Sequence, residues 1–345
     1  MIYIAINVVF NAFVLALVLL LGVDIIHHMP PIVAWCVSYA VVGVLALLGY
    51  TRLGNSIVSI FLPGRAMIGR EKAKLEPLLS DVIENVNHEY GTHYKLSDFK
   101  IKVTDDKVVN AFAVGYNTIT VNRGAFDAFS DEQLRAILAH EVAHLYYRDS
   151  VRSIALIFSS FGTRVIMWIY AIYSIVAQAL AGIGSKSRNE GMQVAGIFAL
   201  IPLLMFLPVV VLNWIGAKVF TLLNMKMSRG AEYRADAFVA SLGYKSDMIG
   251  ALEVLDGITV YDNSFFGKLL ATHPANMQRI GALEDEELAK KKIGNLFVAS
   301  PFSKSNDIHI TGNKEVIRLA AVLIVAGIVW CIWGGWEHIK PLFFE

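Results

Sequence analysis

The segment Leu134–Asp149, LRAILAHEVAHLYYRD, decides the fold, because its apolar residues recur at helical spacing. Ser130 precedes it as a candidate N-cap. His140 and His144 are four residues apart, so a helix presents both imidazoles on one face, where they can bind one metal ion. Glu141 follows the first histidine and can reach a water molecule on that ion. The pattern predicts a metal site with a general base on one helical turn, as in zinc hydrolases.

The motif alone fixes only three residues, so a surface helix with two solvated histidines is the alternative interpretation. The cysteines limit the choice of metal ligands. Cys36 and Cys331 both lie in long apolar runs and offer neither a disulfide framework nor a thiolate cluster. Any metal ion must then be bound by histidine and carboxylate.

The composition indicates a membrane protein. The 345 residues are 56% hydrophobic and 17% charged, with a mean hydropathy of +0.54. A net charge of +1 gives no reason to expect nucleic-acid binding. Met1–Val23 and Ile32–Tyr50 carry no charge and are each long enough to cross a bilayer. The missing basic n-region disfavours a cleaved signal peptide, so these two runs predict a transmembrane hairpin.

Three more apolar runs follow, at Val165–Gly184, Gly191–Ala217 and Leu319–Trp336. Lys and Arg gather after the second and fourth runs, which predicts cytoplasmic segments there and an outside C-terminus. The predicted organisation is a transmembrane hairpin (1–50), the first half of a cytoplasmic domain with the histidine helix (51–152), spans 3 and 4 (153–217), the second half of that domain (218–300), and a linker with a fifth span (301–345).

The first cytoplasmic segment has the pattern of a small helix-and-sheet domain. Glu71–Glu89 is charged and periodic, which predicts an amphipathic helix. Phe99–Val103, Ala111–Gly115 and Thr118–Val121 predict short strands, separated by turn residues. This domain leads into the His140 helix.

A second acidic pair stands in Ser228–Ala240, SRGAEYRADAFVA. Glu232 and Asp236 are four residues apart and share a helical face. In zinc enzymes with two histidines and one glutamate, the glutamate comes from a later helix, and a carboxylate one turn on can orient a ligand imidazole. The alternative is a solvated acidic face balanced by Arg229 and Arg234. The His140 helix on the same side of the membrane favours the metal interpretation.

Four segments together resemble one family. They are NAFAVG at Asn110–Gly115, LAHEVAHLYYRD at Leu138–Asp149, SRGAEYRAD at Ser228–Asp236 and THPANMQRI at Thr272–Ile280. In content and order they are similar to the HtpX-type integral membrane zinc metalloproteases, a superfamily shared with the CAAX prenyl proteases and the mitochondrial stress metalloprotease. The resemblance implies one zinc ion per chain.

The resemblance also implies the role of each residue in the site. His140, His144 and Glu232 would bind the zinc ion, Glu141 would be the general base, and Asp236 would support the ligands.

Two further roles rest mostly on the resemblance. His273 would help to stabilise the oxyanion, and Arg279 would steady the glutamate ligand. An edge strand would pair with an extended substrate backbone, a form of β-augmentation. Its residues are Asn110, Ala111, Phe112 and Ala113. The alternative for this segment is an ordinary strand with Phe112 in the core.

The predicted fold class is an α-helical membrane protein with a small α+β cytoplasmic zincin-like metalloprotease domain. The implied function is a membrane-embedded zinc-dependent endopeptidase that cleaves membrane or misfolded proteins, in quality control or stress response at a bacterial inner (plasma) membrane. Its partners would be protein substrates and the lipid bilayer, with no nucleic acid.

Two other function classes stay open. A narrower processing enzyme of the prenyl-protein type usually has a larger chamber than five spans would build. An inactive scaffold of the same fold would be expected to lack a ligand or the base, and all four of those residues are present.

Overall fold

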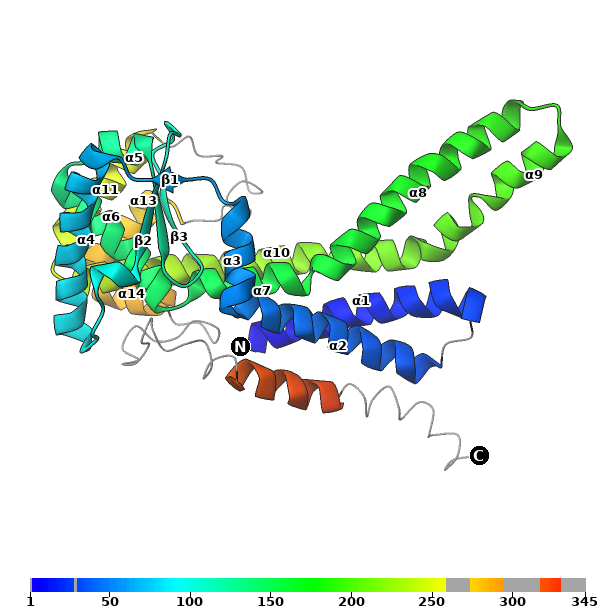
Figure 1. Ribbon diagram of the computed structural model, residues 1–345, viewed down its shortest axis with the longest axis horizontal. Helices are drawn as coiled ribbons and strands as arrows, with labels where there is room; N and C mark the ends of the chain where they lie inside the picture. Colours follow the sequence, from blue (N-terminus) through cyan, green and yellow to red (C-terminus); the bar gives the residue numbers. More distant parts are fainter. Residues whose placement is uncertain (1, 28–29, 259–273, 294–316, 330–345) are drawn as a thin grey trace. The chain divides into compact units, whose positions relative to one another are not determined.

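The computed structural model describes residues 2–27, 30–258, 274–293 and 317–329 (Figure 1). The chain divides into two compact units. Unit 1 comprises Met1–Gly49, Ala155–Phe220 and Val316–Glu345, and unit 2 comprises Tyr50–Ile154 and Thr221–Glu315. Each unit is thus assembled from separated stretches of the chain.

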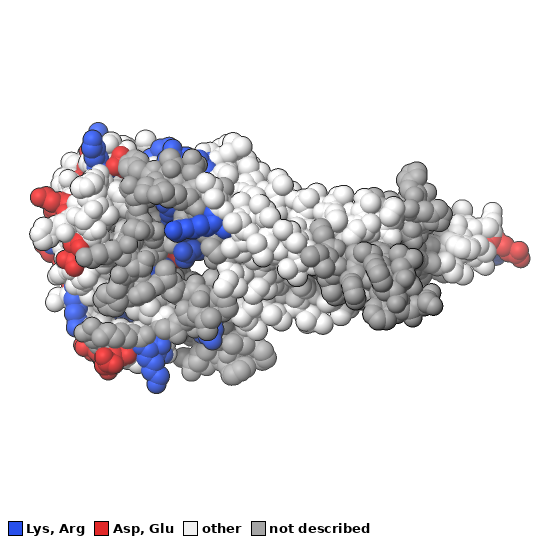
Figure 2. Space-filling model, turned by 90° about the horizontal axis from the view of Figure 1, so that it is seen from below, with Lys and Arg blue, Asp and Glu red and all other residues white. Residues whose placement is uncertain are grey.

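Unit 1 is built from long apolar helices. They are α1 (Ile2–His27), α2 (Pro31–Tyr50), α8 (Phe161–Lys186), α9 (Glu190–Phe198) and the N-terminal half of α10 (Ile201–Ser241). Within the residues that the structure describes, four helical stretches are long and apolar enough to cross a membrane: Ile2–Leu21, Pro31–Tyr50, Phe161–Lys186 and Glu190–Ser241. Such runs are helical because, in hydrocarbon, each backbone N–H and C=O needs a partner within the chain. On the face drawn in Figure 2, charged side chains are sparse over these helices and gather over unit 2.

Two buried polar pairs join helices within unit 1. Ser159, the last residue of α7 (Asp149–Ser159), donates to Asn7 Oδ1 at 2.6 Å. Thr163 in α8 donates to Asn11 Oδ1 at 2.6 Å. An unsatisfied amide would be costly in this apolar setting, so these bonds select the helix faces that meet.

Unit 2 contains one four-stranded sheet. Its strands are β1 (Arg65–Ala66), β2 (Lys100–Thr104), β3 (Ala111–Val114) and β4 (Thr118–Asn122), in the order β1-β2-β4-β3. β2 and β4 are parallel, while β3 is antiparallel to β4, with Ala113 opposite Ile119. Gly115 supplies the positive φ of 63° that the β3–β4 turn needs. This order leaves β3 at an edge of the sheet.

Helices supply most of unit 2. They are α3 (Arg52–Phe61), α4 (Gly69–Tyr90), the 3-10 helix η1 (Leu96–Asp98), α5 (Arg123–Ala128), α6 (Asp131–Tyr146), the C-terminal half of α10, α11 (Lys245–Ile258), α13 (Asn276–Glu284) and α14 (Glu286–Ile293). α6 packs against α4, α11 and β3 (Figure 1). Leu134 and Leu138 of α6 are fully buried, and each such side chain contributes about 1.5–3 kcal/mol. Phe238 of α10 stacks on Tyr90 of α4, with 4.6 Å between ring centroids. The core thus joins the two stretches of the chain that make up unit 2, one before and one after unit 1's middle helices.

The predicted fourth span and the acidic pair belong to one helix. The apolar run ends at Ala217 and the pair lies in Ser228–Ala240, and α10 is continuous from Ile201 to Ser241. Charged residues end an apolar run without ending a helix, and no proline follows Pro208 inside α10. The break comes earlier, between α9 and α10, where Pro202 occupies the first turn of a new helix.

Several described elements were not predicted, among them β1, α3, η1, α5 and α11, and two predictions lie partly or wholly outside the described residues. β1 is only two residues long, and α3 precedes the helix expected at Glu71–Glu89. The fifth apolar segment is a helix over Ile317–Val329, the part of it that the structure describes. His273 lies outside the described residues.

Candidate metal centre

α6 begins with a capping box. Ser130 Oγ accepts the Gln133 N–H at 3.3 Å, and Gln133 Oε1 accepts the Ser130 N–H at 3.1 Å. The helix is buried on nearly all sides, so polar side chains on it are enclosed. His140 is 4% exposed and Glu141 is 6% exposed. Polar groups buried so deeply need partners.

Donor atoms of three residues from α6 and α10 converge. His140 Nε2 lies 3.2 Å from His144 Nε2. Glu232 Oε2 lies 3.3 Å from His140 Nε2, and Glu232 Oε1 lies 3.6 Å from His144 Nε2. In a tetrahedral site with metal–ligand bonds of about 2.0–2.2 Å, the donors are about 3.3–3.6 Å apart. The spacing therefore suits one tetrahedral metal ion.

The chemistry of these donors also fits zinc. The Nδ1 atom of each histidine faces an aspartate, at 3.0 Å for His140 and 3.1 Å for His144. A ring that donates through Nδ1 keeps its lone pair on Nε2. The two lone pairs and the Glu232 carboxylate then face one another and repel, unless a proton or a metal ion lies between them. Zinc prefers such nitrogen and oxygen donors.

Arg279 and Asp236 hold His140 in place. Asp236 Oδ1 accepts from His140 Nδ1, and Arg279 contacts both Asp236 oxygens, through Nη2 at 2.6 Å and Nε at 2.8 Å. Arg279 Nη1 also lies 3.3 Å from Glu232 Oε2. One buried arginine from α13 therefore contacts the partner of the first histidine and the glutamate donor.

A parallel arrangement holds His144, and the sequence pattern did not predict it. Asp149 Oδ2 faces His144 Nδ1 at 3.1 Å, and Arg234 Nη2 lies 2.6 and 2.7 Å from the two Asp149 oxygens. The Arg234 side chain is fully buried, with its guanidinium 4.0 Å above the Tyr147 ring. In the sequence, Arg234 suggests only a counter-charge on an acidic face. The available signal was an acidic residue directly after the histidine helix.

Burial and neighbouring charges set the protonation of the centre. Burial raises the pKa of Glu141 above its ordinary value, although the two histidines lower it. A general base needs a raised pKa near the working pH. Burial alone would lower the pKa of His144, but hydrogen bonds to Asp149 and Glu232 outweigh it and hold the pKa well above its ordinary value.

The edge strand β3 touches Glu141 directly. The Ala113 N–H donates a hydrogen bond to the Glu141 carboxylate. Ser150 Oγ donates to the Ala113 carbonyl at 2.9 Å. The Asn122 N–H donates to the Asn110 carbonyl at 3.0 Å, so Asn110 faces β4 while Ala113 faces the outer edge. Both polar backbone groups of Ala113 are therefore engaged beside the base.

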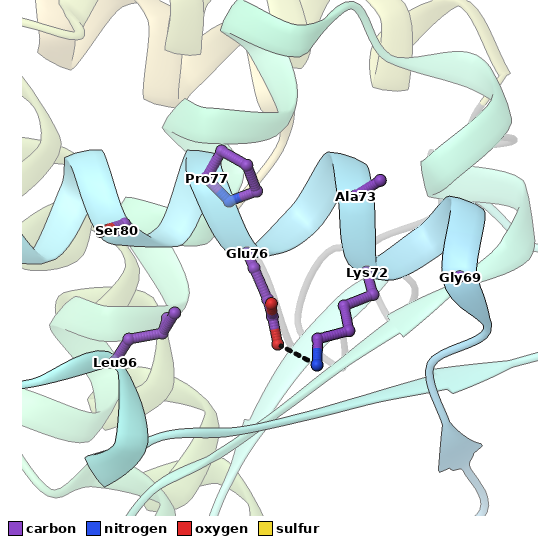
Figure 3. A pocket seen from close by; sticks show the side chains of 7 residues that line it. All are labelled: Gly69, Lys72, Ala73, Glu76, Pro77, Ser80 and Leu96. Atoms are coloured by element: carbon purple, nitrogen blue, oxygen red, sulfur yellow. Dashed lines mark ion pairs between the residues drawn. The ribbon is translucent and has the colours of Figure 1, made fainter.

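The other residues that were predicted to bind substrate lie on β3 or directly before it. Ala111 and Phe112 are half-buried, so Phe112 is not enclosed in the core. An open hollow elsewhere, along α4, includes no residue of the metal centre (Figure 3). It is lined by Gly69, Lys72, Ala73, Glu76, Pro77, Ser80 and Leu96.

Comparison with known proteins points to one group of enzymes. The model of Peptidase family M48 matches residues 72–287. Protease HtpX of Stenotrophomonas maltophilia is 28% identical over 276 residues, which cover 73% of this chain and 90% of that protein. Protease HtpX of Cronobacter sakazakii is 27% identical over 280 residues, with 73% and 90% coverage. Among solved structures, S. mikatae Ste24p matches with a TM-score of 0.43 and 19% identity, covering 78% of this chain and 62% of that one.

Proposed function

The chain belongs to peptidase family M48 and is a membrane protease, and from that premise we propose that it is a zinc-dependent endopeptidase. His140, His144 and Glu232 would bind one zinc ion, and Glu141 would be the general base. The observation that carries this proposal is the convergence of three residues. His140 Nε2 and His144 Nε2 are 3.2 Å apart, and they lie 3.3 and 3.6 Å from the two different oxygens of Glu232, with Glu141 adjacent to the first histidine. A zinc ion bound there would supply Lewis-acid chemistry for an attacking water molecule and the peptide carbonyl.

The chain's own residues would carry the proton. Glu141 would take it from the attacking water molecule and pass it to the leaving amine, so no serine or cysteine nucleophile is needed. The Ala113 N–H, which bonds to the Glu141 carboxylate, would hold that carboxylate in place. His273 would be the oxyanion partner, a role that rests on the resemblance to the HtpX-type proteases.

The proposed substrates are membrane or misfolded proteins, and the proposed role is quality control or stress response in a bacterial inner membrane. The four candidate spans in the described part of the chain and the relatives named Protease HtpX from two bacteria support this location. An extended substrate backbone would pair with β3, the edge strand beside Glu141, through outward-facing backbone groups other than those of Ala113, which bond to Glu141 and Ser150. Pairing of this kind recognises backbone rather than side chains, which suits an enzyme that accepts many sequences.

Two variants separate metal binding from base chemistry. In Glu232→Ala, we expect bound zinc to be lost or greatly reduced, and with it all cleavage. In Glu141→Gln, we expect zinc content to match the wild type while peptide cleavage is abolished. Metal analysis of the purified protein and cleavage of a membrane-protein panel measure both. A Glu141→Gln protein that cuts at the wild-type rate would eliminate this residue as the base.

The proposed orientation places Thr51–Ser150 and Ala217–Ile317 in the cytoplasm and the C-terminus outside. It is tested by cysteine labelling in a variant without native cysteines. A cysteine introduced at Ser80 should be labelled from the cytoplasmic side. Cysteines introduced at Lys186 and at Lys340 should both be labelled from the outside. Labelling of Ser80 from the outside would reverse the orientation.

A further inference from the structure

Helix α3 carries large apolar side chains that are not packed into unit 2. Leu53, Ile57, Ile60 and Phe61 are 62%, 37%, 77% and 82% exposed. Their positions at i, i+4, i+7 and i+8 place them on one face of the helix. Single exposed apolar residues are ordinary on a protein surface, but four on one face of a ten-residue helix mark an interaction surface.

The other face of α3 is packed against the β3–β4 turn. Gly54 and Asn55 are buried. A Cβ atom on Gly115 would lie 2.8 Å from Asn55 Oδ1, so the turn rests directly on α3. Tyr116, the next residue of the turn, donates its hydroxyl hydrogen bond to the Tyr50 carbonyl just before α3. These contacts fix which face of α3 points outward.

The connection of α3 to α2 indicates what covers the apolar face. α2 ends at Tyr50 and is long and apolar enough to cross a membrane. A single residue, Thr51, separates it from α3, and its hydroxyl accepts the Gly54 N–H at 3.3 Å as the N-cap. Consecutive Cα atoms are about 3.8 Å apart, so Arg52 lies within about 8 Å of the end of α2, whatever the angle between the helices. α3 therefore begins where a membrane span ends.

We propose that α3 is an interfacial membrane anchor, with its apolar face in the headgroup and upper acyl region of the bilayer. Amphipathic helices in this position bury the apolar face about 5–10 Å into the boundary. The guanidinium of Arg52, at the start of the helix, would lie among lipid phosphates. Because the β3–β4 turn is packed on α3, the anchor would also hold β3 near the membrane surface. On the proposed function, β3 would there receive substrate segments as they leave the bilayer.

Fluorescence quenching tests the anchor without relying on activity. The full chain, carrying Glu141→Gln and lacking Cys36 and Cys331, is labelled at an introduced cysteine in Ile60→Cys. It is then reconstituted into phosphatidylcholine–phosphatidylglycerol vesicles that contain doxyl lipids. A cysteine at exposed Ser80 on α4 is the matched control. We expect doxyl groups near the headgroup to quench the label at position 60 about threefold more than at position 80, and aqueous iodide to quench it less.

Each other outcome overturns the anchor. Equal quenching at the two positions would mean that α3 faces water. Stronger quenching by doxyl groups at the chain ends would place α3 inside the hydrocarbon. Disulfide-linked dimers through position 60 in the membrane would show that a second copy of the chain covers this face.

A functional variant gives a second, independent result. In active protein, Leu53→Glu with Ile60→Glu should lower cleavage of a bilayer-embedded substrate by about tenfold, while hydrolysis of a soluble peptide changes less than about twofold. Equal effects on the two substrates would contradict the anchor.

Discussion

Replacing Asp149 with Asn should weaken zinc binding although Asp149 is not itself a donor to the metal. Its carboxylate faces His144 Nδ1 at 3.1 Å and so fixes which ring nitrogen keeps the lone pair for the metal ion. An amide at this position is neutral and can turn its NH₂ group toward the ring, which would favour the wrong tautomer. Loss of such a partner typically lowers metal affinity about 10–100-fold, or about 1.4–2.8 kcal/mol.

The same change affects stability, and the two effects must be separated. Arg234 is fully buried and lies 2.6 Å from Asp149 Oδ1, so Asp149→Asn leaves a buried charge without its carboxylate. Breaking a buried ion pair in this way costs about 3–5 kcal/mol. Asp149→Asn combined with Arg234→Met removes both charges, and such replacements are often neutral in stability. We therefore expect the double variant to regain stability but to keep the weak zinc affinity.

Zinc competition with a chromogenic chelator in detergent measures the affinity, and thermal unfolding of the metal-free protein measures the stability. Arg152→Gln is the matched control, because Arg152 Nη1 reaches Asp149 Oδ1 only at 3.5 Å and should change affinity less than about twofold. If the double variant recovers wild-type zinc affinity together with its stability, Asp149 acts only through the fold and the reasoning is refuted.

Three further predictions concern the base, the core and an ion pair. Ala113→Pro removes the N–H that bonds to Glu141, so cleavage should fall at least about tenfold. Zinc content and melting temperature should change little. Retained activity would make β3 purely structural. Phe238→Ala should lower the free energy of unfolding by about 3–5 kcal/mol in chemical denaturation, and a loss below about 1 kcal/mol would contradict its place in the core. Pairing with Arg65 lowers the pKa of Glu71 from its ordinary 4.5, so its contribution to stability is complete above pH 4.5 and fades as pH falls. Glu71→Gln should therefore be less stable by about 1–2 kcal/mol at pH 7 and approach the wild type near about pH 3, and a pH-independent difference would count against the ion pair.

The ligand helix was predictable because its information is local. His140, Glu141 and His144 lie within one turn of one helix, so helical geometry alone brings them together. Glu232 needed an analogy with other zinc enzymes, because its distance from His140 along the chain is 92 residues, from the numbering 232 − 140. The resemblance to HtpX-type proteases and the fold class are confirmed by the family match and the apolar helices.

The supporting contacts were not predictable, because they are non-local. Asp149 and Arg234 are 85 residues apart, and their pairing depends on how the first residue of α7 and the C-terminal half of α10 come together in the fold. Arg234 is two positions from Glu232 and from Asp236 in the sequence, which suggests a solvated helix face instead. For α3 the signal is present in the spacing of Leu53, Ile57 and Ile60. The basic residues after the second span obscure it, because they indicate the start of a soluble segment.

Zinc K-edge X-ray absorption of the purified protein tests the central claim most directly. We predict about one zinc ion per chain with two imidazole nitrogens at about 2.0–2.1 Å and a carboxylate oxygen at about 2.0–2.2 Å, and loss of the bound ion in Glu232→Ala. A protein that takes up no zinc, or whose zinc environment is unchanged in Glu232→Ala, would contradict a metal centre built from His140, His144 and Glu232.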